Sequence, residues 1–118
     1  MSVQWIEHRG KRILFTNMKG VKDEAEIHRI LELQFQAIAS SKEPVLLMIN
    51  VEDSPMTPAN NQFTKEQFPT VKTKIQKIAM VGMTGLKGVI VDGIDRSVGT
   101  VIHNYCGTED EAKEWLIQ

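Results

Sequence analysis

Short apolar stretches along the chain predict five β-strands. These stretches are Val3–Glu7, Arg12–Thr16, Val45–Val51, Lys77–Met83 and Thr100–Cys106. The turn formers Arg9-Gly10-Lys11 separate the first two stretches, which indicates an antiparallel hairpin. The third stretch is apolar throughout instead of alternating with polar residues. That pattern is typical of a parallel strand in the middle of a sheet, where other layers cover both of its faces.

Apolar residues at helical spacing predict helices between these strands. From Lys22 to Ser41 the apolar positions follow a 3.6-residue period and give one buried face, made of Ile27, Ile30, Leu31, Phe35 and Ile38. A second helix is expected over Pro58–Gln76. We expect a break or kink near Phe68, because Pro69 has no N–H to donate to the helix.

Two more helices complete the prediction. One is expected over Gly85–Ser97, between the last two strands. The other follows Thr108, which forms a capping box with Glu111, and it turns Ala112, Trp115 and Leu116 inward. The resulting order is ββαβαβαβα. It predicts an α/β fold with a mixed, mostly parallel five-stranded sheet, an N-terminal β-hairpin and helices packed on the sheet.

Composition indicates one soluble globular domain over residues 1–118. Hydrophobic residues are 42% and charged residues 25% of the 118, which is ordinary for this class. The formal net charge of −1 gives no global attraction to nucleic acid or anionic lipid. One cysteine cannot form an internal disulfide, which favours the cytoplasm. We see no signal peptide and no apolar run of roughly 20 residues, so we expect no stable membrane insertion.

The loop after the third strand carries the first candidate site. It reads Glu52-Asp-Ser-Pro-Met-Thr-Pro-Ala-Asn60, and its candidate residues are Asp53, Ser54, Met56 and Thr57. In open α/β sheets, ligands gather beyond the carboxyl ends of the strands. One interpretation is therefore a partner or ligand contact, or a switch in which Ser54 is phosphorylated. The simpler interpretation is that these side chains make turn and helix-cap hydrogen bonds.

The turn after the fourth strand carries the second candidate site. Its candidate residues are Met83, Thr84 and Gly85, within the segment Gly82-Met-Thr-Gly-Leu-Lys-Gly88. Backbone N–H groups at a helix start can hold an anion, although this spacing matches neither a dinucleotide fingerprint nor a P-loop. We expect the two candidate loops to lie side by side at the end of the sheet where these strands finish. Met56 and Met83 would give this surface adaptable apolar contacts.

No arrangement of residues predicts catalysis, a cofactor or a metal site. His8, His28 and His103 lack metal-ligand spacing, and Cys106 lacks a suitable basic partner. A basic stretch comprises Lys65, Lys72, Lys74 and Lys77. It lacks the interleaved aromatic residues of a nucleic-acid surface, so we expect a solvated face. The chain is therefore expected to be no enzyme and to bind no nucleic acid.

Four segments resemble small bacterial proteins of the SpoIIAA-like, STAS-type family. They are Ile6–Leu14, Val45–Val51, Val81–Lys87 and Glu109–Leu116, and the resemblance spans essentially the whole chain. STAS antagonists carry Asp-Ser-Ser-Gly, with a phosphorylated serine, where the central strand meets the second helix. This chain has Asp53-Ser54-Pro55-Met56 there and keeps only the first two residues. The resemblance implies a SpoIIAA-like fold and leaves phosphorylation of Ser54 open.

The resemblance implies two functions of different kinds. The first is a non-enzymatic binding or regulatory module, similar to anti-sigma-factor antagonists, which contacts a protein partner through the two candidate loops. The alternative is a carrier of a small apolar or lipid-like ligand, because the architecture is related to the SEC14 lipid-binding domain. A chain this short leaves little volume for an enclosed cavity once its core is filled. A homodimer through the initial hairpin or an exposed helix is also compatible with the sequence.

Overall fold

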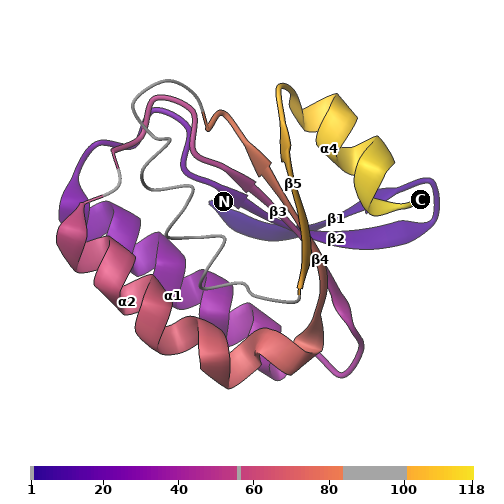
Figure 1. The fold of residues 1–118 in the computed structure, drawn as a ribbon, viewed down its shortest axis with the longest axis horizontal. Helices are drawn as coiled ribbons and strands as arrows, with labels where there is room; N and C mark the ends of the chain where they lie inside the picture. Colours follow the sequence, from indigo (N-terminus) through magenta and orange to yellow (C-terminus); the bar gives the residue numbers. More distant parts are fainter. Residues whose placement is uncertain (1, 56, 84–100) are drawn as a thin grey trace.

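The computed structural model describes residues 2–55, 57–83 and 101–118, and its elements follow the predicted order (Figure 1). The strands are β1 (Val3–His8), β2 (Lys11–Asn17), β3 (Val45–Asn50), β4 (Ile75–Val81) and β5 (Ile102–Cys106). The helices are α1 (Glu24–Ser40), α2 (Pro58–Val71) and α4 (Glu109–Leu116), with a 3₁₀ turn, η1 (Lys72–Lys74), after α2. None of these helices is long and apolar enough to span a membrane. The helix expected over residues 85–97 lies outside the described residues.

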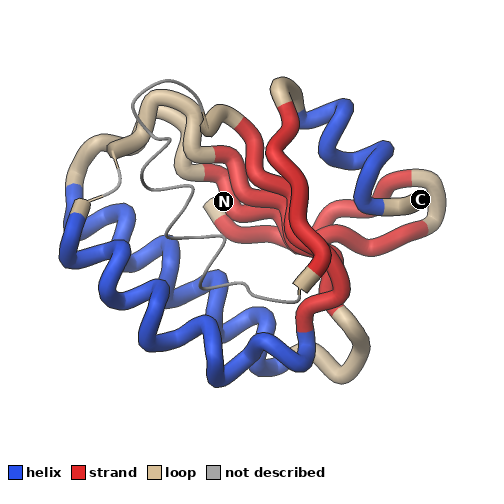
Figure 2. The backbone as a smooth tube through the Cα atoms, viewed as in Figure 1, coloured by secondary structure: helices blue, strands red, loops and turns tan. Residues whose placement is uncertain are grey.

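The five strands form one mixed sheet in the order β1-β2-β3-β4-β5 (Figure 2). β1 pairs antiparallel with β2, and every other neighbouring pair is parallel, so the predicted sheet is confirmed. Arg9 and Gly10 form the two-residue turn of the hairpin. Their φ angles are 49° and 80°, and positive φ at both positions is the requirement of a type I′ turn.

β3 lies in the middle of the sheet with an apolar layer on each side. α1 and α2 cover one face of the sheet and α4 covers the other (Figure 1). The first core joins the sheet residues Leu14, Leu47, Ile78 and Met80 to Ile27, Ile30, Leu31, Phe35 and Ile38 of α1. The second core joins Ile13, Phe15, Leu46, Met48, Ala79 and Val81 to Ala112 and Leu116 of α4. Successive residues of β3 alternate between the two cores, which explains why this strand is apolar throughout.

The end of α2 differs from the prediction. The helix is not broken at Phe68 but continues through Pro69 and ends at Val71, where η1 follows. Pro69 removes one N–H from the helical ladder, and the chain leaves α geometry soon after it. β4 consequently begins at Ile75, earlier than the predicted start at Lys77.

Two lysines of the predicted basic stretch bind the carboxyl ends of helices. Lys74 Nζ donates to two backbone carbonyl oxygens at the end of α1, at 2.7 and 3.3 Å. Lys77 Nζ donates to two at the end of α4, at 3.3 and 3.0 Å, and lies 5.1 Å from the centroid of the Trp115 ring. A cation at this position offsets the negative end of the helix dipole. These two lysines therefore remain partly exposed and in addition bind helix ends.

We predict that Lys77→Ala lowers the free energy of unfolding by about 1 kcal/mol, because α4 loses two hydrogen bonds and a cation at its carboxyl end. Lys65→Ala is the matched control, since Lys65 is exposed on α2. Urea denaturation should show a change below about 0.5 kcal/mol for this control. Equal effects in the two variants would contradict the role assigned to Lys77.

Candidate functional site

The carboxyl ends of β2, β3, β4 and β5 lie at the same end of the sheet, where both candidate loops begin (Figure 1). We name this end of the sheet the carboxyl pole; its described segments are residues 18–23, 51–55, 57, 82–83 and 107–109. The N–H of Val51 donates to the carbonyl oxygen of Val81 at 2.9 Å. The loop after β3 therefore starts beside the end of β4. This arrangement confirms the predicted neighbourhood of the two loops as far as Met83.

Gly82 lies against the backbone of Glu52 in the other loop. Its φ is +85°, and a Cβ at this position would lie 2.6 Å from the Cα of Glu52. A backbone atom cannot move aside as the end of a flexible side chain can, so only glycine allows this approach. Met83 is partly buried against the core under α1. The other candidates at this pole, Met56, Thr84 and Gly85, lie outside the described residues.

We predict that Gly82→Ala lowers the free energy of unfolding by at least about 2 kcal/mol, because the methyl group meets the Glu52 backbone and the φ is unfavourable for alanine. Gly20→Ala is the matched control. Gly20 has a φ of +73°, but a Cβ there would meet no atom within 4 Å, so its cost should be about 1 kcal/mol. Thermal and urea denaturation measure both. A smaller loss for Gly82→Ala than for Gly20→Ala would show that the loops are not held together at this point.

Ser54 and Thr57 both use their hydroxyl groups in hydrogen bonds to backbone groups. Ser54 is 4% exposed, and its hydroxyl donates to the carbonyl oxygen of Val21 at 2.8 Å. Because Val21 precedes α1, this bond ties the loop after β3 to the start of the first helix. Thr57 Oγ1 accepts from the N–H of Asn60 at 3.3 Å and thereby caps α2. The Thr57 contact confirms the cap interpretation, whereas the Ser54 hydroxyl bonds a distant segment and makes neither a turn bond nor a helix cap.

Carboxylates outnumber amino groups at the carboxyl pole. Asp53 has a φ of +56°, and its exposed carboxylate lies 3.5 Å from Lys22 Nζ. Glu52 lies 3.4 Å from Lys19 Nζ. The other carboxylates of the pole, Asp23 and Glu109, stand at the starts of α1 and α4, where they complement the helix dipoles. Next to the pole, the first turns of these helices add Glu24, Glu26, Asp110 and Glu111. The described surface of this pole therefore disfavours an anion.

A buried asparagine at the end of β3 connects three segments of the pole. Asn50 is 2% exposed, and its Nδ2 donates to Glu109 of α4 at 2.7 Å. Its Oδ1 accepts from the N–H of Glu52 at 2.9 Å, and its carbonyl oxygen accepts from the N–H of Met18 at 2.8 Å. A functional or structural role for Asn50 was not predicted from the sequence. Its one signal is an amide side chain at the end of an otherwise apolar strand.

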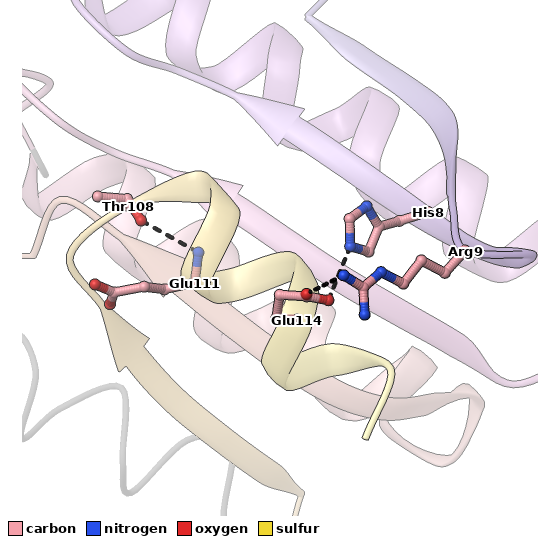
Figure 3. A network of polar contacts seen from close by, with 5 residues as sticks. All are labelled: His8, Arg9, Thr108, Glu111 and Glu114. Atoms are coloured by element: carbon pink, nitrogen blue, oxygen red, sulfur yellow. Dashed lines mark hydrogen bonds and ion pairs between the residues drawn. The ribbon is translucent and has the colours of Figure 1, made fainter.

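The three histidines make structural contacts. His8 Nε2 lies 3.0 Å from one carboxylate oxygen of Glu114, and Arg9 lies 2.8 Å from the other, so the hairpin is tied to α4 (Figure 3). His28 packs against the ring of Phe63 of α2 in a tilted arrangement, with the centroids 4.3 Å apart. His103 Nδ1 lies 2.9 Å from a backbone carbonyl oxygen. Within the described ranges, no three His, Cys, Asp or Glu side chains gather so that they could hold a metal ion.

The thiol of Cys106, at the end of β5, has a raised pKa, whereas a nucleophilic cysteine needs a lowered one. Burial raises the pKa of its thiol, and the carboxylate of Glu111 raises it further. Glu111 is fixed at the start of α4: its N–H donates to Thr108 Oγ1 at 3.1 Å (Figure 3), which confirms the predicted cap. Its carboxylate accepts from the N–H of Gly107 at 3.2 Å and not from the N–H of Thr108, so the second bond of the predicted capping box forms one residue earlier. A nucleophilic cysteine needs a lowered pKa, which this environment does not provide.

We predict that Cys106 reacts with iodoacetamide at about pH 8 more slowly than a cysteine in an unfolded peptide, because a raised pKa leaves less thiolate. Glu111→Gln removes a negative neighbour, lowers the thiol pKa and should speed the reaction. Asp110→Asn changes the net charge equally and should leave the rate almost unchanged. Mass spectrometry of the folded protein measures the rates. A slower reaction after Glu111→Gln would be incompatible with this account of the thiol.

A small apolar cavity lies between α1, α2 and the sheet. Its volume is about 60 Å³, and its walls include Met18, Leu31, Phe35, Phe68 and Met80. Gln34 also lines it; this side chain is 2% exposed, and its Oε1 has no hydrogen-bond partner in the described part of the chain. Pockets for drug-sized ligands measure roughly 300–1,000 Å³. The cavity is thus too small for a lipid-like molecule in the observed conformation.

Comparison with known proteins bears on the fold. No family model matches the chain, and no curated protein matches it. Among solved structures, an uncharacterised DUF3478-family protein from Shewanella loihica PV-4, with a SpoIIAA-like fold, is similar with a TM-score of 0.74. The alignment covers 97% of this chain and 91% of that chain at 13% sequence identity. The chain has a SpoIIAA-like fold, as the resemblance predicted. At this identity the likeness establishes the architecture alone, since one fold hosts many functions.

Proposed function

We propose that the chain is a non-enzymatic binding module that recognises a protein partner through the carboxyl pole. The observation that carries this proposal is the contact between Gly82 and Glu52, which holds the loops after β3 and β4 together as one surface. Ligands of open α/β sheets gather at this end of the sheet. The described segments 51–55 and 82–83 are held by contacts within the fold, so they lose little conformational freedom when a partner binds.

The charges of the pole favour a partner with a basic surface. Glu52 and Asp53 are exposed, and carboxylates at the starts of α1 and α4 flank them. Complementary charge speeds the encounter of two proteins and selects among partners. The two ion pairs with Lys19 and Lys22 are exposed, so a basic partner can replace them at small cost.

The contacts of the reactive side chains support a role without catalysis. An active site brings together a nucleophile, a base and groups that stabilise developing charge. In the described structure, the hydroxyls of Ser54 and Thr57 hydrogen-bond to backbone groups, and the thiol of Cys106 has a raised pKa. His8 contacts a carboxylate that also binds Arg9. Among the described residues, no hydrogen bond or ion pair joins the His8 ring to Ser54, Thr57 or Cys106.

Phosphorylation of Ser54 is the means of regulation that we propose for this surface. The hydroxyl is buried against Val21, so a kinase reaches it only when the loop after β3 opens. A phosphate would add negative charge beside Asp53 and could not occupy the space of the bonded hydroxyl. Modification would therefore separate this loop from the start of α1 and change the surface that the partner meets.

The carrier alternative has weaker support. A lipid-like ligand needs several times the volume of the cavity under α2, which measures about 60 Å³. The unpaired amide oxygen of Gln34 favours a small polar group there, but α2 would have to move away from the sheet before a larger molecule could enter.

A photo-crosslinking amino acid placed at Asp53 tests the proposed surface, with Lys65 as the matched exposed control on α2. We expect irradiation in the native cells to give a specific protein adduct at position 53 and none at position 65. Glu52→Lys should weaken the adduct at 53, because it reverses the charge that attracts a basic partner. Equal adducts at both positions, or none at position 53, would sink the proposal.

Mass spectrometry of the same samples separates the remaining alternatives. A phosphate mass on Ser54 supports the regulatory switch, and its absence under all growth conditions counts against it. A small molecule retained by the native protein supports the carrier function instead of the protein-binding module.

A further inference from the structure

β1 is an edge strand, and the backbone N–H and C=O groups of every second residue point away from β2. In a two-residue hairpin the residues that flank the turn form a hydrogen-bonded pair, and such pairs alternate along an antiparallel ladder. His8 is the turn-flanking residue of β1, and the carbonyl oxygen of Ser2 again accepts from the backbone at the end of β2, at 2.7 Å. The residues between them that point their N–H and C=O groups outward are therefore Val3, Trp5 and Glu7.

No other described strand pairs with this outer edge of β1. The outward groups make no hydrogen bond with any described residue. Natural edge strands are commonly protected by proline, by lysine or by a bulge. β1 reads VQWIEH with continuous pairing, and has none of these. At the opposite edge of the sheet, by contrast, Asn104 Oδ1 accepts from the N–H of Tyr105 at 3.0 Å, so a side chain engages a backbone donor of β5.

Trp5 stands in the middle of the free edge. It is 36% exposed, although the guanidinium of Arg12 lies 4.3 Å from its ring centroid. The side chain is thus partly covered, in part by a cation, and about a third of it remains exposed to solvent. Tryptophan and arginine are the residues that most often dominate protein interfaces. Exposed indole beside unpaired backbone groups is the composition expected of a strand that pairs with another chain.

We propose that β1 pairs antiparallel with β1 of a second copy of this chain, about a two-fold axis through Trp5. Trp5 then lies opposite its own equivalent, and Val3 lies opposite Glu7. This axis engages the outward groups of all three residues, whereas an axis through Gln4 or Ile6 engages those of only two residues within β1. The sheet continues without interruption across the two molecules.

The side-chain pairs of this register favour association. Cross-strand aromatic pairs stabilise sheets, and the two exposed indoles become direct neighbours. Glu7 faces Val3 and Gln4 faces Ile6, so no like charges stand opposite one another. A foreign strand could bind the same backbone groups, but a second copy also matches the exposed aromatic residue with itself.

Analytical ultracentrifugation tests the pairing. The unaltered chain should show a monomer–dimer equilibrium that approaches twice the 13.3 kDa mass. Glu7→Pro removes one outward N–H at an edge position, where proline is tolerated, and should raise the dimer Kd at least about tenfold. Glu7→Ala keeps that N–H and should raise the Kd much less. Circular dichroism checks that both variants are folded. If Glu7→Pro does not fold, Trp5→Lys replaces it as the variant that disrupts the dimer.

Disulfide trapping tests the register. In a Cys106→Ser background, Trp5→Cys should crosslink two chains on oxidation, because Cα atoms about 5.5 Å apart in a hydrogen-bonded pair lie within disulfide range. Glu7→Cys should not, since it faces Val3. Three results would overturn the proposal: a chain that stays monomeric up to about 1 mM, equal Kd values for Glu7→Pro and Glu7→Ala, or crosslinking of Glu7→Cys without Trp5→Cys. A monomer whose β1 edge is covered by an added protein would overturn it as well.

Discussion

Burial of β3 on both faces is the constraint around which the other elements are arranged. Leu47 lies in the core under α1, while Leu46 and Met48 lie in the core under α4. Burying each such side chain contributes roughly 1.5–3 kcal/mol relative to exposure to water. A strand of this kind needs a layer on each face, and its neighbours β2 and β4 run parallel to it. The loops that follow these three strands must therefore leave the sheet at the same end.

The layer formed by α4 is held in place by contacts from the sheet. α4 runs from Glu109 to Leu116 and is too short to be stable alone in water. It is tied at its start by Asn50 and at its end by Lys77, and Glu114 binds it to the hairpin through His8. The carboxyl pole shares the first of these contacts, so the proposed partner surface is continuous with the second core. Pairing of two chains through β1 would leave this pole free in both.

Local patterns predicted most of the fold, whereas contacts between distant segments were not predictable from them. The apolar run of β3 and the cap at Thr108 are signals that a few neighbouring residues carry. The partners of Asn50, Ser54 and Lys77 lie across the fold, and periodicity does not encode which segments meet. For the candidate site, the sequence identified the two loops because parallel strands direct them to one end of the sheet. It did not reveal that Ser54 is buried, since that depends on the placement of α1.

Native-state hydrogen exchange of the β3 amides tests the central claim most directly. If β3 is buried between two layers, the amides of residues 46–49 exchange only through global unfolding. Their protection free energy then equals the free energy of unfolding from denaturation. The exposed amide of Asp53, in the loop that β3 feeds, should exchange with much lower protection. Exchange of residues 46–49 by local opening, with protection well below the global value, would contradict the account.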